Sequence, residues 1–333
     1  MFVFNFLIFA IILFSVIVVL IFRKWKISLL LFAVVIILNF YWQFFSINIS
    51  SLFNSTKGDS FRIVTYNIYP DSDSANLILW QKKMFEEIKR MNPDILCLQE
   101  FNVQKLPLLE KELNKYYSYT TEIVKQRRKL KGKLYSRFDL TDIRVYKPNS
   151  ALDTLDYPVS FRKSIKVHNR RQPFYSAVAH LPSGDSVVVY SCHLQSNGYS
   201  SIRRQMKNED WAKGIPNYYS SIKNAEKIRQ WEACNLRYYI DSLYPSRNVI
   251  VAGDFNDFSA SKSIKTVTGN TLKDAWWGYG NGVGITYCGF HLFFRLDHIL
   301  VTNRVTVRKI DVGDCRLSDH RPLVVDLDIC NKW

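Results

Sequence analysis

Six short polar segments stand out in the sequence, because each adjoins an apolar run and carries side chains capable of chemistry. Each contains at least one carboxylate, amide or imidazole group, and together the segments are spread over more than two hundred residues. The segments are Thr65-Tyr66-Asn67, Leu98-Gln99-Glu100, Cys192-His193-Leu194-Gln195-Ser196-Asn197, Gly253-Asp254-Phe255-Asn256-Asp257, Arg295-Leu296-Asp297-His298 and Leu317-Ser318-Asp319-His320-Arg321-Pro322.

The residue types in these segments indicate phosphate-ester chemistry around a hard cation. Glu100 is a hard oxygen ligand suited to Mg²⁺, with Mn²⁺ as the alternative, and Asn67 can add a neutral oxygen to the same site. Asp254 and Asn256 lie two residues apart where an expected strand ends, so both can face one phosphate. His320 needs an acidic partner that fixes its tautomer and stabilises the imidazolium.

In their order and contents the six segments resemble the endonuclease/exonuclease/phosphatase superfamily, over about residues 61–328. That superfamily includes DNase I-like nucleases, abasic-site endonucleases, sphingomyelinases and inositol-polyphosphate phosphatases. The resemblance implies that Asp254 orients the attacking water or binds a metal, that Asp297 is the partner of His320, and that Asp319 faces the metal. It assigns catalytic roles to His320, Asp254, His193 and Asp297, phosphate contacts to Asn256 and Asn197, and metal ligation to Glu100, Asn67 and Asp319.

Apolar runs and helical periodicity alternate along the chain, as in an α/β protein. Strands are expected over 61–67, 94–100, 187–193, 248–254, 295–301 and 322–327, and helices over 77–91 and about 223–243. Asn92-Pro93 ends the first of these helices. A polar stretch, 196–222, precedes the second. The resemblance implies an α/β sandwich of four layers, in which two mixed β-sheets pack face to face with helices outside.

Two runs near the N-terminus, 1–22 and 27–46, contain no charged residue, and Arg23, Lys24 and Lys26 lie between them. Each run is long enough for a transmembrane helix. A cleaved signal peptide or a buried helical hairpin is the alternative. The basic turn predicts a two-pass membrane protein whose catalytic domain lies on the extracytoplasmic side, which is the periplasm in a two-membrane bacterium. We therefore expect a hairpin over 1–46, a linker over 47–60 and a catalytic domain over 61–333.

The net charge of +16 favours polyanionic partners, although a lysine-rich surface has the same composition. Basic residues cluster in 125–133 and 203–207, and Tyr199, Tyr218 and Tyr219 could stack on bases or pack in the core. The six cysteines form no C-x-x-C pair, which argues against a structural zinc site. His298 is expected to be structural, as are Trp276 and Trp277.

These patterns predict a metal-dependent phosphoesterase that uses water directly and needs no covalent intermediate. Two substrate classes remain open: nucleic acid, as for an endonuclease, and lipid or inositol phosphates, as for a sphingomyelinase or inositol phosphatase. A third reading is an inactive, membrane-tethered module that binds polyanions. No obligate protein partner is evident from the sequence.

Overall fold

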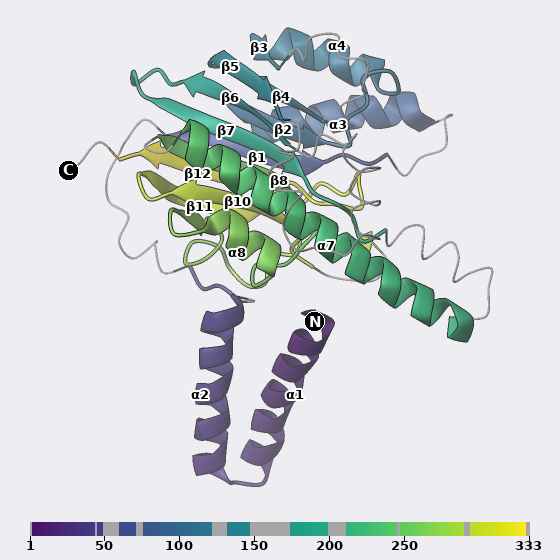
Figure 1. Cartoon of the computed structure of the whole chain (residues 1–333), viewed down its shortest axis with the longest axis vertical. Coiled ribbons are helices and arrows are strands. Elements are labelled where there is room, and N and C mark those ends of the chain that lie inside the picture. The colour runs from purple at the N-terminus through teal and green to yellow at the C-terminus, as the bar shows by residue number, and fades with distance from the viewer. Residues whose placement is uncertain are drawn as a thin grey trace.

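Two mixed β-sheets form the centre of the protein in the computed structural model (Figure 1). The structure describes residues 2–43, 45–48, 60–70, 76–121, 132–146, 174–198, 211–244, 247–289 and 294–330. The first sheet has the order β11-β12-β1-β2-β4-β3 and the second β5-β6-β7-β8-β10-β9. The strands are β1 Phe61–Asn67, β2 Ile95–Gln99, β3 Tyr119–Thr120, β4 Gly132–Ser136, β5 Asp139–Val145, β6 Phe174–His180, β7 Ser186–His193, β8 Asn248–Asp254, β9 Leu272–Asp274, β10 Asp297–Thr302, β11 Val305–Val312 and β12 Leu323–Ile329.

Three apolar clusters make the sandwich. The central cluster joins inward-facing residues of both sheets, among them Ile63 and Val325 from the first sheet and Val189 and Ile250 from the second. On the outer face of the first sheet pack α3 Leu77–Met91 and α4 Pro107–Tyr116, and α7 Trp211–Leu243 and α8 Lys262–Thr268 cover the second. The predicted fold class, two mixed sheets packed with outer helices, is therefore confirmed.

Strand register brings the polar ends of separate strands to one edge of the sandwich. Within the first sheet β1 and β2 run parallel, with Asn67 opposite Gln99. In the second sheet β7 and β8 are parallel, and Asp254 lies opposite both His193 and Asp297. Since the two sheets pack against each other at β1 and β8, these ends meet across the interface between them.

The N-terminal runs form two helices, α1 Phe2–Ile21 and α2 Trp25–Trp42, which project as a pair from one end of the sandwich (Figure 1). Within the residues that the structure describes, however, no helix has the length and apolarity needed to cross a bilayer. The predictions of two transmembrane helices and of a lipid bilayer as partner are thus unsupported, and the predicted membrane localisation is wrong. A run without charged residues is compatible with a bilayer span but does not alone establish one. The boundaries at residues 46 and 60 remain a prediction.

The segment after α2 is attached to the sandwich by hydrogen bonds. Ser46 and Gly282 exchange two backbone hydrogen bonds of 2.9 and 2.8 Å, and Gly278 N donates to Ser46 Oγ at 2.9 Å. Ser46 is only 2% exposed. The glycine-rich segment 278–284 therefore provides the docking point for the chain that leaves the helix pair.

Gly253 on β8 is paired with Cys192 on β7, one residue before the site residues Asp254 and His193. A Cβ atom built on Gly253 would lie 2.0 Å from the backbone oxygen of Cys192, which cannot move without distorting β7. We predict that Gly253→Ala lowers the free energy of unfolding by more than about 3 kcal/mol or prevents folding. Urea unfolding followed by tryptophan fluorescence measures this.

Gly184→Ala is the matched control, because Gly184 has φ +89° but no atom within 4 Å of its built Cβ. Gly184→Ala should lower the free energy of unfolding by only about 1 kcal/mol, which is the cost of a left-handed backbone in a residue other than glycine. Equal losses in the two variants would contradict the close approach at Gly253.

Candidate active site

Asn67 connects residues from both sheets at the edge where the strand ends meet. Its amide nitrogen donates to Asp254 Oδ2 at 2.9 Å and to Glu100 Oε1 at 3.3 Å. Ser318 Oγ donates to the backbone oxygen of Asn67 at 2.8 Å, which brings the 317–322 segment, and with it Asp319, beside β1. Four of the six predicted segments, including that of Asn67 itself, thus meet at the end of β1.

Asp254 is buried and held by amide donors on both oxygens. Its Oδ1 accepts a hydrogen bond from the backbone N of Asn256 at 2.8 Å, and Oδ2 accepts from the Asn256 side chain at 3.1 Å as well as from Asn67. Burial is the main reason that the pKa of Asp254 rises to about 7, while the nearby His320 opposes the rise. At neutral pH this carboxylate is therefore able to exchange a proton.

His320 pairs with Asp297 as the sequence predicts. His320 Nδ1 lies 2.8 Å from Asp297 Oδ2, and its Nε2 lies 3.7 Å from Asp254 Oδ2. Burial alone would lower the pKa of His320, but Asp297 and Asp254 outweigh it and raise the pKa to about 10. His320 is thus an imidazolium at neutral pH.

His193 completes the group of titratable residues. Its Nε2 lies 3.8 Å from Glu100 Oε1 and 3.7 Å from Asp254 Oδ2. Two of the surrounding residues, Glu100 and Asn256, have left-handed backbones with φ of 55° and 51°. For residues other than glycine this conformation costs about 1 kcal/mol each, and such strain is concentrated at functional sites. Glu100 directly follows β2, and Asn256 is the second residue after β8.

Two sets of residues are candidates for holding a metal ion. Among the described residues, ligand atoms of Asp254, Asp297 and His320 lie within 4.8 Å of one another. Within this set, however, His320 Nδ1 and Asp297 Oδ2 are already paired with each other at 2.8 Å. The predicted set of Glu100, Asn67 and Asp319 fits better, because the buried Oδ1 of Asn67 has no hydrogen-bond partner. Burial also raises the pKa of Asp319, because it disfavours the charged carboxylate. A metal ion bound beside Asp319 would stabilise the charged form and lower this pKa again.

Asn197 is buried and makes contacts within the protein. Its side-chain oxygen accepts a hydrogen bond of 2.8 Å from Arg229, and its nitrogen lies 3.5 Å from the backbone oxygen of Asn256. Asn197 therefore lies between Arg229 and the backbone of Asn256. The contact of Asn197 with phosphate stays a prediction. His298 is structural as expected, since it is fully buried and lies 3.0 Å from Asp274.

Two neighbours of the site belong to no sequence motif. The Tyr287 ring lies 5.0 Å from the His320 ring, and Arg229 of α7 reaches the loops after β7 and β8. No local sequence pattern indicates these contacts, because each joins residues that are far apart in the sequence. The basic stretch 203–207 and Tyr199 lie outside the described residues, as do 125–131 of the other basic stretch and the side chains of Tyr218 and Tyr219.

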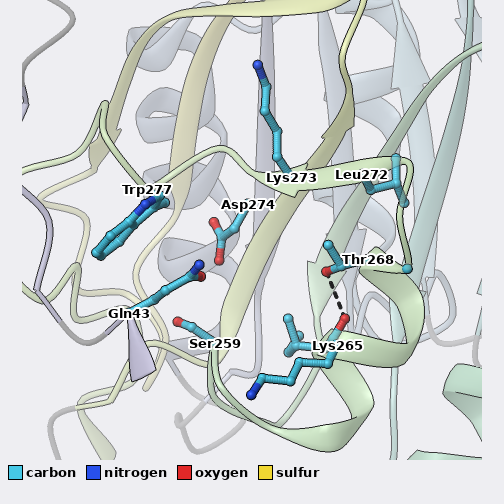
Figure 2. A pocket seen from close by; sticks show the side chains of 10 residues that line it. Gln43, Ser259, Lys265, Thr268, Leu272, Lys273, Asp274 and Trp277 are labelled. Carbon is cyan, nitrogen blue, oxygen red and sulfur yellow. Dashed lines mark hydrogen bonds between the residues drawn. The ribbon is translucent and has the colours of Figure 1, made fainter. Parts of the chain in front are cut away.

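A cavity of about 330 Å³ lies on another part of the surface (Figure 2). Gln43, Ser259, Asp274 and Trp277 converge on it, with Lys265 and Thr268 from α8. None of the nine predicted site residues lines this cavity. Asp274 is already paired with Arg295 at 2.8 Å, which holds its pKa below the usual range although burial opposes this. The clustered charges around Asp254 are therefore the better candidate for chemistry.

A model of the endonuclease/exonuclease/phosphatase family matches residues 47–320. The chain belongs to this family. Its members are phosphoesterases and nucleases that generally depend on divalent metals. No curated protein sequence matches the chain significantly. The family match says nothing of a membrane anchor or of a bacterial source.

Solved structures share this fold at low identity. A humanized TDP2 from D. rerio is 16% identical with a TM-score of 0.55, covering 81% of this chain and all of that one. The human Nocturnin catalytic domain with bound sulfate is 18% identical with a TM-score of 0.55, covering 81% and 93%. An endonuclease/exonuclease/phosphatase family protein from Bacteroides thetaiotaomicron is 15% identical with a TM-score of 0.55, covering 82% and 96%. These likenesses support the fold alone.

The pairing of His320 with Asp297 makes a prediction that does not depend on activity. Because Asp297 raises the pKa of His320, Asp297→Asn should move that pKa down from about 10 by one unit or more. Titration of the imidazole resonances by NMR measures the shift. Asp274→Asn, which removes a carboxylate bonded to His298 instead, is the control and should leave His320 unchanged. An unaltered His320 titration in the Asp297 variant would contradict the pairing.

Proposed function

We propose that this protein is a divalent-metal-dependent phosphodiesterase that hydrolyses nucleic acid by in-line attack of water. The observation that carries the proposal is the single cluster in which Asn67 links Glu100 to Asp254 while Asp254 faces the His320–Asp297 pair. The cluster combines hard oxygen donors, a carboxylate that can exchange a proton at neutral pH, and a fixed cation. Together these three features can neutralise a phosphodiester anion, activate water and stabilise the transition state.

Glu100, Asn67 Oδ1 and Asp319 are the residues that would hold Mg²⁺ or Mn²⁺. When bound, the cation supplies charge neutralisation for the phosphate and lowers the barrier to attack. The uncompensated buried oxygen of Asn67 and the all-oxygen donor set support this assignment. We keep the alternative that Asp254 also contacts the metal.

The remaining residues act directly on the phosphate and the water. Protonated His320 places a positive charge beside the reacting group and stabilises charge that develops in the transition state. Asp254 accepts a hydrogen bond from the attacking water and takes its proton as the water oxygen bonds to phosphorus. The bond from phosphorus to the leaving oxygen, opposite the water, breaks at the same time, and the leaving oxygen takes up a proton from solvent. We expect Asn256 to contact a phosphate oxygen by redirecting a side-chain N–H that here donates to Leu194 or Asp254, and His193 to lie on the side of the phosphate or leaving group. No Cys or Ser nucleophile is needed, so no covalent intermediate is formed.

Nucleic acid is the substrate class that we favour. A net charge of +16 attracts the phosphate backbone, and TDP2 from D. rerio has been solved with a single-strand DNA product. Lipid and inositol phosphates are the other class for this chemistry, and nothing in the described residues favours them. An inactive binding module is disfavoured because all nine predicted residues retain chemically competent side chains.

The test uses the purified full chain with Mg²⁺ on plasmid DNA, single-stranded DNA, RNA, sphingomyelin and inositol phosphates, with bis(p-nitrophenyl) phosphate as a general phosphodiester. Hydrolysis of the diester and of nucleic acid, abolished by EDTA, is expected. His320→Ala should lower kcat by about 10²–10⁴-fold without unfolding the protein, because it removes a positioned cation.

His180→Ala is the matched control, because His180 is an exposed histidine at the end of β6 and should leave the rate unchanged. Hydrolysis that survives EDTA, or a normal rate in the His320 variant, would overturn the mechanism. Turnover of sphingomyelin or inositol phosphates alone would keep the mechanism and reject nucleic acid as the substrate.

A further inference from the structure

Helix α7 inserts two charged side chains beneath the loops that carry the site. Arg229 and Glu232 are one turn apart, so they share a face, and they are only 3% and 1% exposed. Glu232 accepts a hydrogen bond of 2.7 Å from the backbone N of Gln195, and Arg229 Nη1 donates to the backbone oxygen of the same residue at 2.9 Å. The peptide groups on both sides of Gln195 are therefore fixed by one helix.

Arg229 also reaches both loops that adjoin the catalytic strands. Its Nη1 donates to Asn197 Oδ1 at 2.8 Å, in the loop after β7, and its Nε donates to Asp257 Oδ2 at 3.3 Å, in the loop after β8. A guanidinium can make these bonds together because its donors form a rigid planar fork. Burying such a charge is unfavourable unless it is paired and hydrogen-bonded, and Arg229 meets both conditions.

These loops orient the groups proposed to contact phosphate. The side-chain nitrogen of Asn256 donates to the backbone oxygen of Leu194 at 3.1 Å, and Leu194 N donates to the backbone oxygen of Asp254 at 2.9 Å. Leu194 directly precedes Gln195, and Asn256 directly precedes Asp257. Arg229 therefore contacts the residue next to each partner of this Asn256–Leu194 hydrogen bond.

We propose that Arg229 is a positioning residue that sets the orientation of Asn256 and His193 toward the scissile phosphate. The expected effect of Arg229 on the reaction rate rests on the proposed function. Its expected effect on the structure of the loops does not. Arg229 itself does not touch the substrate. It fixes the distance between the loops after β7 and β8, so that the Asn256 amide and the His193 ring address one phosphate.

The test compares Arg229→Ala and Arg229→Lys in the full chain by hydrogen exchange and by kinetics with bis(p-nitrophenyl) phosphate. We expect amide exchange at residues 194–198 and 255–258 to accelerate at least about tenfold, with β1 and β2 unchanged. The rate should fall about 10²-fold, mainly in kcat, because a displacement of about 1 Å is enough for this loss. Guanidinium ion, added below its denaturing concentration, should partly restore both readouts in the Ala variant.

Arg237→Ala is the matched control, since Arg237 is two turns further along α7 and pairs with Asp241 and Thr271 away from the site. It should change neither the loop exchange nor kcat. Should Arg229→Ala fail to fold, the Lys variant decides, because it retains the charge opposite Asp257 but not the fork.

Three results would overturn the proposal: unchanged loop exchange in both variants, exchange that rises uniformly over all strands, or a normal kcat despite loosened loops. If the parent protein lacks phosphodiesterase activity, the exchange data alone decide whether Arg229 holds the loops. In that way failure of the proposed function and failure of this role are distinguishable.

Discussion

The charge balance around Asp254 is the constraint on which the site depends. Asp254 and Asp297 are both almost fully buried, and two carboxylates cannot both remain ionised in such a place without a compensating cation. His320 supplies that cation at 2.8 Å from Asp297, and its pKa is raised for the same reason. The remaining stabilisation of Asp254 comes from the amides of Asn67 and Asn256. Each group in the cluster thus sets the protonation state of its neighbours.

Sheet register makes this balance possible. Asp254 is opposite His193 on one neighbouring strand and Asp297 on the other, while Asn67 and Glu100 come from the facing sheet. A slip of one residue in any of these strands would turn the site residue to the opposite face. The apolar core between the sheets therefore determines where the charges lie, and α7 fixes the loops that extend beyond the strands.

Local patterns in the sequence were sufficient to predict several elements. β1, β8 and α3 have the predicted bounds, because apolar runs and a stop at Asn92-Pro93 delimit them. The helix expected from about residue 223 instead begins at Trp211, because the polar residues of this segment, with Gly214 and Pro216, resemble a loop in sequence. Short strands such as β9 could not be predicted, since pairing with distant strands forms them. The contacts of Arg229 and Tyr287 with the site could not be predicted either, because they depend on long-range packing. Charge-free runs also gave the wrong localisation, because they do not alone establish a bilayer span.

A crystal structure with Mn²⁺ and a non-hydrolysable phosphodiester, in which anomalous scattering locates the manganese, would test this site most directly. We predict a manganese ion about 2.1 Å from an oxygen of Glu100 and from Asn67 Oδ1, with a phosphate oxygen completing its coordination and His320 facing the same phosphate. A manganese ion bound elsewhere, or bound by the His320 imidazole itself, would contradict it.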